Sequence, residues 1–183
     1  MEIAMFPFGF QRNCAPYVPS APRIIRAMLK LANVTTSDVV YDLGCGDGRI
    51  LVTAVNAFHV KQAIGYELDA QRYQTALQSI RQHGLQDKVT IVQGDLFEAD
   101  LSMATVIILF LTVMGNVRLR PKLEREAPWG SRIVSRRFDI DGWTPAQIQR
   151  VEGDILFLYR VPDAFLKLFG LDLQPEEQQN KNI

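Results

Sequence analysis

The nine residues YDLGCGDGR, at positions 41–49, decide the fold of this chain. They join an apolar run, Val39–Leu43, to a second one, Arg49–Phe58, whose apolar residues recur at helical spacing. A buried strand that leads through a glycine turn into a helix is the first half of a βαβ unit. In an open sheet of such units, ligands bind beyond the carboxyl ends of the strands, which is where this turn must lie.

The alternation of strands and helices continues along the chain at a spacing of about 25 residues. Further strands are predicted at 63–67, 89–93, 105–111 and 132–136, and a closing hairpin at 147–151 and 155–160. Helices are predicted at 21–31 (with Ser20 as the N-cap), 70–83, 122–126 and 163–171. This order predicts an α/β fold, with a parallel sheet covered by helices.

Length and composition indicate one globular domain. The chain has 183 residues, of which 48% are hydrophobic and 22% charged, and this excludes a disordered or fibrous protein. Its 20 basic and 20 acidic residues cancel, so the charge balance does not favour strong nonspecific binding of DNA or of an anionic membrane. The longest apolar run, 104–113, is half the length that a bilayer requires, so no transmembrane segment is expected.

The two ends of the chain differ from its centre. Residues 1–10 are apolar without the features of a signal peptide, and they can pack on the domain, on a partner or on a lipid surface. Cys14 and Cys45 match no zinc or redox spacing, so we expect no metal and a reducing cytoplasm. We divide the chain into an arm and helix (1–37), a core (38–162), and an amphipathic helix with a polar tail (163–183).

The glycine turn distinguishes between two kinds of cofactor. Asp42 lies near the end of the first strand, two residues before Gly44, where its carboxylate suits a ligand that carries a cation, such as the ammonium group of an amino acid. The glycines are spaced G-x-G-x-G rather than G-x-G-x-x-G, and Asp47 adds a second negative charge beside the turn. The turn therefore disfavours the pyrophosphate of a dinucleotide.

Two more acids follow the next two strands. Glu67 ends the second strand, and its two carboxylate oxygens can accept hydrogen bonds from both hydroxyls of a ribose. Asp95 follows the third strand, where it can accept from an adenine amino group, and Leu68, Leu96 and Phe97 can supply apolar walls for the base. Because carboxyl ends of parallel strands share one edge of the sheet, the set predicts a nucleoside cofactor.

This arrangement, over residues 38–160, resembles the class I methyltransferases that use S-adenosylmethionine. The resemblance implies a doubly wound, Rossmann-like, mostly parallel sheet of seven strands, with helices on both faces and an antiparallel last strand. It also implies that Asp42 and the glycines line the methionine part of the cofactor, that Glu67 binds the ribose, and that Asp95 with Leu96 binds the adenine.

A narrower resemblance adds the acceptor. The segments PYVPS (16–20), GYEL (65–68), KLERE (122–126), SRIVSRRF (131–138) and GWTP (142–145) occur in the order seen in the protein-lysine methyltransferases that modify the ATP synthase c subunit and the adenine nucleotide translocase. This resemblance implies that the segment 17–20 folds over the cofactor. The predicted cofactor-binding residues are Tyr17, Pro19, Asp42, Leu43, Gly44, Cys45, Gly46, Gly48, Glu67, Leu68, Asp95, Leu96 and Phe110.

The acceptor side follows the fourth strand. Enzymes that methylate base amines often carry an Asn/Asp-Pro-Pro-aromatic turn there, whereas Phe110, Leu111 and Thr112 predict the floor of an apolar channel. Such a channel suits the aliphatic part of a lysine, and desolvation helps its ammonium group to lose a proton. Tyr17 is a further acceptor-channel candidate, and Trp143 either lines the acceptor site or covers the sheet edge.

No residue is identified as a general base, because the two histidines, at 59 and 83, are predicted on helices away from the strand ends. The sequence thus predicts a protein-lysine methyltransferase, without a metal and with nucleic acid as a disfavoured partner. Two alternatives remain: a small-molecule or nucleic-acid methyltransferase on the same scaffold, and a binding protein that holds the cofactor without turnover.

Overall fold

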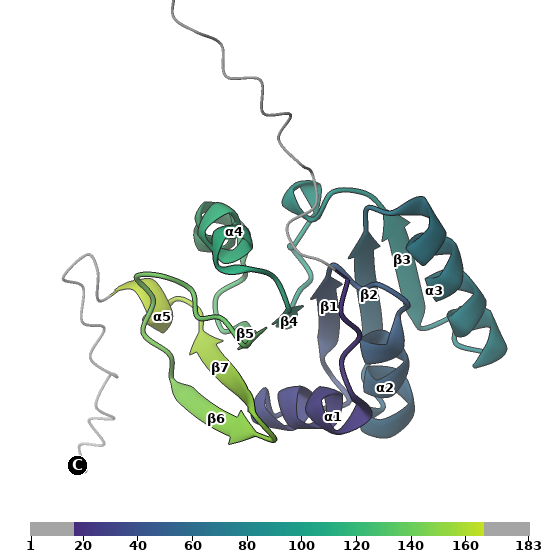
Figure 1. Ribbon diagram of the computed structural model, residues 1–183, viewed down its shortest axis with the longest axis horizontal. Helices are drawn as coiled ribbons and strands as arrows, with labels where there is room; N and C mark the ends of the chain where they lie inside the picture. The colour runs from purple at the N-terminus through teal and green to yellow at the C-terminus, as the bar shows by residue number, and fades with distance from the viewer. Residues whose placement is uncertain (1–16, 167–183) are drawn as a thin grey trace, which may run out of the picture.

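The computed structural model describes residues 17–166, in which a seven-stranded sheet separates two layers of helices (Figure 1). The strands are β1 (Val39–Leu43), β2 (Gln62–Glu67), β3 (Val89–Gln93), β4 (Val106–Leu109), β5 (Arg132–Arg136), β6 (Gln147–Val151) and β7 (Asp154–Arg160). The predicted apolar segment 1–10, Cys14 and most of the predicted helix and tail after 163 lie outside the described residues.

The sheet order is β3-β2-β1-β4-β5-β7-β6, and the pairs among β1 to β5 are all parallel. The last strand of the chain, β7, runs antiparallel to both of its neighbours, β5 and β6. The chain order reverses at β1, whose neighbours are β2 and β4, so β1 is the switch point beside which ligands bind in such sheets. The predicted fold class is confirmed.

Helices cover both faces of this sheet, and each layer has its own apolar core. On one face pack α1 (Pro22–Leu31), α2 (Arg49–Phe58) and α3 (Ala70–Gln82). On the other face lie the short 3-10 helix η1 (Leu96–Glu98), α4 (Val113–Glu126) and α5 (Asp163–Leu166). Every residue of β1 and β4 is buried, which explains why these strands are continuous apolar runs rather than alternating ones.

Two predicted elements have the wrong extent. The fourth strand ends at Leu109, not at 111, because Thr112 begins α4 by accepting a hydrogen bond from the N–H of Gly115 (3.1 Å). This helix contains Pro121, which was predicted as its boundary. A proline inside a helix costs about 3 kcal/mol, but burial of Leu119 and Leu123, four residues apart, contributes roughly 1.5–3 kcal/mol each and outweighs that cost.

The predicted N-cap of α1 is also wrong. Ala21 occupies the N-cap position and makes no side-chain capping bond. Ser20 is buried, and its hydroxyl accepts a hydrogen bond from Arg136 instead (2.7 Å). Within residues 17–166, no helix is long and apolar enough to cross a bilayer.

Candidate active site

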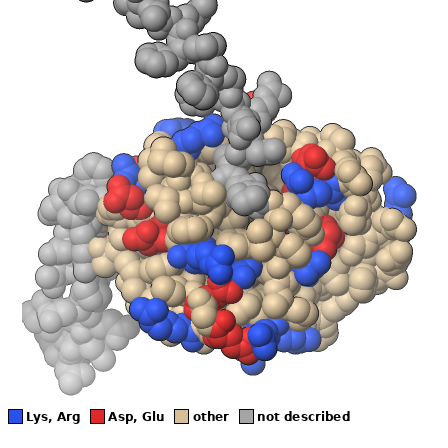
Figure 2. Space-filling view, viewed as in Figure 1, with Lys and Arg blue, Asp and Glu red and all other residues tan. Residues whose placement is uncertain are grey.

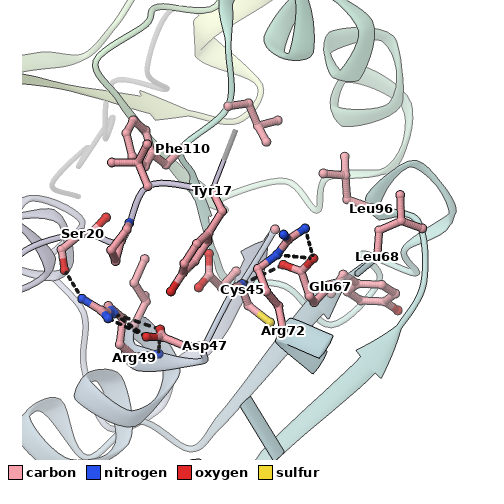
Figure 3. Close-up of a pocket in the computed structure, with 18 of the residues that line it drawn as sticks. Tyr17, Ser20, Cys45, Asp47, Arg49, Glu67, Leu68, Arg72, Leu96 and Phe110 are labelled. Atoms are coloured by element: carbon pink, nitrogen blue, oxygen red, sulfur yellow. Dashed lines mark hydrogen bonds and ion pairs between the residues drawn. The ribbon is translucent and has the colours of Figure 1, made fainter. Parts of the chain in front are cut away.

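A pocket opens at the carboxyl ends of β1, β2 and β4 and is closed on one side by residues 17–20 (Figure 3). It brings together most of the predicted site residues, namely Tyr17, Pro19, Asp42, Gly44, Cys45, Gly46, Glu67, Leu68, Asp95, Leu96, Phe110 and Leu111. Leu43, Gly48, Thr112 and Trp143 do not line it. Leu43 is buried in the core beneath α4, and Gly48 is the N-cap of α2.

The glycine turn has a conformation that other residues adopt only at a cost. Gly44, Gly46 and Gly48 have φ angles of +95°, +57° and +80°, in the left-handed region that favours glycine. At Gly46 the space is also taken, because a Cβ atom there would lie 2.6 Å from the Tyr17 ring. The turn therefore needs glycine both for its backbone conformation and for the close approach of residues 17–20, the N-terminal arm.

Asp42 is a buried carboxyl group that still has hydrogen-bonding capacity. Its side chain is buried, and its Oδ2 atom has no hydrogen-bond partner among the described residues. Desolvation, together with the nearby charges of Glu67 and Asp47, raises the pKa of Asp42 to about 8. A cation at this point would offset the cost of burying the charged carboxylate and its repulsion by the two neighbouring acids, so the site favours a positively charged ligand group.

Glu67 is held in place from two directions. Its Oε2 atom accepts a hydrogen bond from the N–H of Gly46 (2.9 Å), which ties the end of β2 to the glycine turn. Its Oε1 atom accepts from the N–H of Asp69 (2.9 Å) and from Nε of Arg72 (3.1 Å). The carboxylate is thus buried, oriented and partly neutralised, as a group that receives ribose hydroxyls must be.

The residues after β3 form the far wall of the pocket. Asp95 caps η1, with Oδ1 accepting from the N–H of Phe97 (3.1 Å), so its carboxyl group is fixed at the pocket edge. Leu68 and Leu96 lie together on the far side of Glu67 (Figure 3). This combination of one carboxylate with two leucines fits the amino group and the apolar faces of a purine.

The N-terminal arm is clamped by residues that the sequence analysis did not assign to the site. Arg49 donates to the carbonyl oxygen of Ser20 (3.1 Å) and binds Asp47 through Nε (2.9 and 3.0 Å). Burial alone would raise the pKa of Asp47, but the hydrogen bonds from Arg49 outweigh it and hold this pKa below its usual range. From α3, Arg72 lies 5.5 Å from the centre of the Tyr17 ring.

The sequence contained part of the evidence for these contacts with the arm. Asp47 and Arg49 lie inside the motif at 41–49, and Arg72 follows Glu67, the acid of β2, by five residues. Local spacing placed these residues near the site, but it could not pair them with a segment about 30 positions away in the chain.

The acceptor side of the pocket is apolar. Phe110 and Leu111 line it, directly after β4, while Thr112 serves as the N-cap of α4. Of the two alternatives for Trp143, the structure supports a packing role: the indole is buried against Tyr159 and Phe165, with centroids 5.5 and 5.2 Å away, and donates to Glu124 (2.9 Å).

Other groups bear less directly on the chemistry. The two histidines are C-cap residues of α2 and α3, at the opposite ends of these helices from the pocket. The Cys45 thiol is buried beside Gly65, and desolvation raises its pKa, which makes it unreactive. Among the described residues, no group of three His, Cys, Asp or Glu side chains could hold a metal ion.

Comparison with known proteins agrees with this geometry. Residues 42–147 match the family model of the ANTKMT methyltransferase domain. A protein-lysine N-methyltransferase of Saccharolobus islandicus is 47% identical over 137 residues, which are 75% of this chain and 85% of that protein. The adenine nucleotide translocase lysine N-methyltransferase of Mus musculus is 32% identical over 146 residues, or 80% of this chain and 63% of that protein.

Solved structures show the same fold. The crystal structure of an RNA methyltransferase from Salinibacter ruber, in complex with S-adenosylhomocysteine, is 38% identical with a TM-score of 0.77, and the match covers 80% of this chain and 95% of that one. The fold and the site thus define a class I methyltransferase. This chain belongs to the family of the ANTKMT methyltransferase domain. It is a methyltransferase whose cofactor is S-adenosylmethionine.

The residues of the pocket fit this cofactor. The ammonium group of its methionine part would meet the unpartnered Oδ2 atom of Asp42, and the turn at Gly46 leaves no Cβ in the way. Glu67 and Asp95 stand at the ends of the next two strands, in the order in which ribose and adenine follow along the cofactor. When bound, S-adenosylmethionine supplies a methyl group on a positively charged sulfur.

Proposed function

We propose that this protein methylates the side-chain amine of lysine in a protein substrate. The observation that carries the proposal is the apolar acceptor side, where Phe110 and Leu111 line the pocket immediately after β4. These side chains can surround the methylene groups of a lysine, and they offer no hydrogen bond to the polar edge of a base. The names of the relatives from Saccharolobus islandicus and Mus musculus support the same acceptor.

The proposed chemistry asks little of the protein beyond positioning and desolvation. A lysine amine attacks only in its neutral form, and an apolar channel favours that form because burial penalises the ammonium ion. The enzyme must then hold the nitrogen about 3 Å from the methyl group, in line with the bond that breaks, and keep water out. The amine loses its proton before the methyl group is transferred, and neither histidine lies near enough to the pocket to accept it.

RNA is a second candidate acceptor, because the Salinibacter ruber structure carries the name of an RNA methyltransferase. The charge distribution supports protein instead. Figure 2 shows Lys and Arg interspersed with Asp and Glu over the visible face, without the large basic patch that phosphate binding requires. The arginines at the pocket, Arg49 and Arg72, are each paired with a carboxylate.

A transfer assay separates the candidates. The full chain is incubated with cell extract and S-adenosylmethionine labelled on the methyl group, and the label is followed into protein, RNA and small-molecule fractions. We expect label in protein bands, and methyl-lysine after hydrolysis, with none for the Asp42→Ala variant. Label that ribonuclease removes would establish the RNA alternative, and label confined to the small-molecule fraction would establish a small-molecule acceptor.

Two further expectations stay predictions. The first is a cytoplasmic location, which the cysteine usage favours. Membrane contact through residues 1–10 concerns a segment outside the described residues. Fractionation of cells that express the tagged chain, with and without residues 1–10, tests both.

A further inference from the structure

A buried arginine stands behind the acceptor side of the pocket. Arg136, the last residue of β5, is 6% exposed, and its guanidinium makes three contacts with three different segments. One nitrogen donates to the hydroxyl of Ser20 (2.7 Å) and another to Oδ2 of Asp154 (2.7 Å). The Cζ atom of the group lies 4.0 Å from the centre of the Phe110 ring.

Two of these contacts are walls of the pocket. Ser20 ends the N-terminal arm and Phe110 begins the acceptor side, and both line the pocket, whereas Arg136 itself does not. The third contact, Asp154, starts β7 and so belongs to the hairpin at the sheet edge. One side chain therefore connects the arm, the acceptor wall and the edge hairpin.

The position of these walls follows from the strand order. Asp42 lies at the end of β1, the switch point itself, and Glu67 and the residues after β3 lie at the ends of β2 and β3, on one side of it. The ends of β4 and β5 lie on the other side of β1, so they face the end of the cofactor site where a methyl acceptor must enter. Figure 3 shows Phe110 and Ser20 on the opposite side of Tyr17 from Glu67.

Arginine is suited to this position in a way that lysine is not. Its planar group presents several N–H donors at fixed angles and stacks on an aromatic ring at the same time. A lysine carries its donors on one nitrogen, so it cannot occupy the two separate donor positions that reach Ser20 and Asp154 while it also covers the Phe110 ring. The charge alone is thus not what this site requires.

We propose that Arg136 is a positioning residue for the methyl acceptor. It holds Ser20 and Phe110 at a fixed separation, so that the channel between the arm and the β4 end keeps the width of an unbranched side chain. It acts through these two residues and does not touch the substrate. The inference rests on the proposed lysine acceptor and adds to it the residue that shapes the channel.

The same strand offers a matched control. Arg132, at the other end of β5, is also largely buried and paired with an aspartate, Asp38, but it contacts the carbonyl oxygens of Ala32 and Asn33 rather than the pocket. If buried arginine pairs on β5 only stabilise the fold, substitutions at 132 and 136 should have the same consequences.

The test compares Arg136→Lys with Arg132→Lys in the full chain. For each we would measure the urea midpoint, the Kd for S-adenosylhomocysteine, and kcat and KM for the labelled protein acceptor. We expect Arg136→Lys to lower kcat/KM by about 10- to 100-fold, as small misplacements in a site do, while its Kd changes less than about threefold. Arg132→Lys should leave both the kcat/KM and the Kd of the folded enzyme unchanged. Equal kcat/KM for the two variants would overturn the proposal.

A gentler variant covers the case in which Arg136→Lys does not fold. Ser20→Ala removes the arm contact and leaves the pair with Asp154 intact. We expect it to lower kcat/KM several-fold and to speed proteolysis within residues 17–20, whereas unchanged proteolysis together with an unchanged kcat/KM would count against the inference. If the wild type labels no protein, the proposed function fails, but proteolysis of the arm still tests the role of Arg136.

Discussion

Without a bound cofactor, the buried carboxyl group of Asp42 lowers the free energy of unfolding at neutral pH, and this cost can be measured. Replacement by asparagine keeps the shape of the side chain and removes its titration. We expect Asp42→Asn to raise the free energy of unfolding at neutral pH and to abolish binding of S-adenosylhomocysteine. A substitution that stabilises the fold and destroys the site identifies a residue kept for function.

The magnitude follows from the shift in pKa. In the unfolded chain Asp42 ionises near its ordinary value of 3.8, whereas in the folded protein burial keeps it protonated up to about pH 8. Between these values the unfolded state binds one proton fewer, so the free energy of unfolding falls as pH rises, by about 1.4 kcal/mol per pH unit. The stability is fully present below the lower pKa and is lost as pH rises through the higher one.

Urea unfolding of the wild type and of Asp42→Asn at pH 5 and pH 7.5 measures the effect. Other titrating groups are common to both proteins, so the difference between their free energies of unfolding isolates Asp42. We expect this difference to grow by about 3 kcal/mol between the two pH values. A difference that stays constant with pH would refute the reasoning, since the carboxyl group would then be ionised in the folded state.

The ligand supplies a second check on the same residue. At 100 times its Kd, S-adenosylhomocysteine should stabilise the wild type by about 2.7 kcal/mol, which is roughly 5–11 °C in Tm for a chain of this size. Its ammonium group compensates the charge of Asp42, so this shift should be absent in Asp42→Asn. A shift of equal size in both proteins would place the ammonium group elsewhere.

Three further predictions concern the arm and the core. Gly46→Ala, which sets a Cβ 2.6 Å from Tyr17 at a φ of +57°, should weaken S-adenosylhomocysteine binding at least about tenfold in a calorimetric titration, while Gly84→Ala, at a φ of +66° with open space around it, should leave binding intact. Arg49→Met should speed proteolysis within residues 17–20 and leave the urea midpoint nearly unchanged, and equal cleavage rates would argue against the clamp. Trp143→Phe should lower the free energy of unfolding by about 1–2 kcal/mol through one lost hydrogen bond and looser packing, whereas a change in the acceptor KM would return this residue to the acceptor site.

Much of the fold was predictable because its signals are local. Apolar runs bounded by glycine and charge located all seven strands, and the motif at 41–49 identified the switch point. The weak place was α4, where Pro121 predicted a break and long-range burial of Leu119 and Leu123 kept the helix intact. A local rule failed there because the deciding contacts come from other parts of the chain.

The candidate site likewise contains residues that local sequence predicts and residues that only tertiary contacts bring together. Asp42, Glu67 and Asp95 were predictable, since each lies at or just beyond the carboxyl end of a strand and parallel strands end at one edge of the sheet. Only the tertiary structure pairs Arg136 with Ser20, 116 positions apart, and places Trp143 in the core rather than in the channel. The sequence by itself determined the cofactor side of this protein, because that side is built from the strand ends themselves. The acceptor side was decided by packing between segments far apart in the sequence, and the hydrophobic pattern of one segment does not reveal which other segment it contacts.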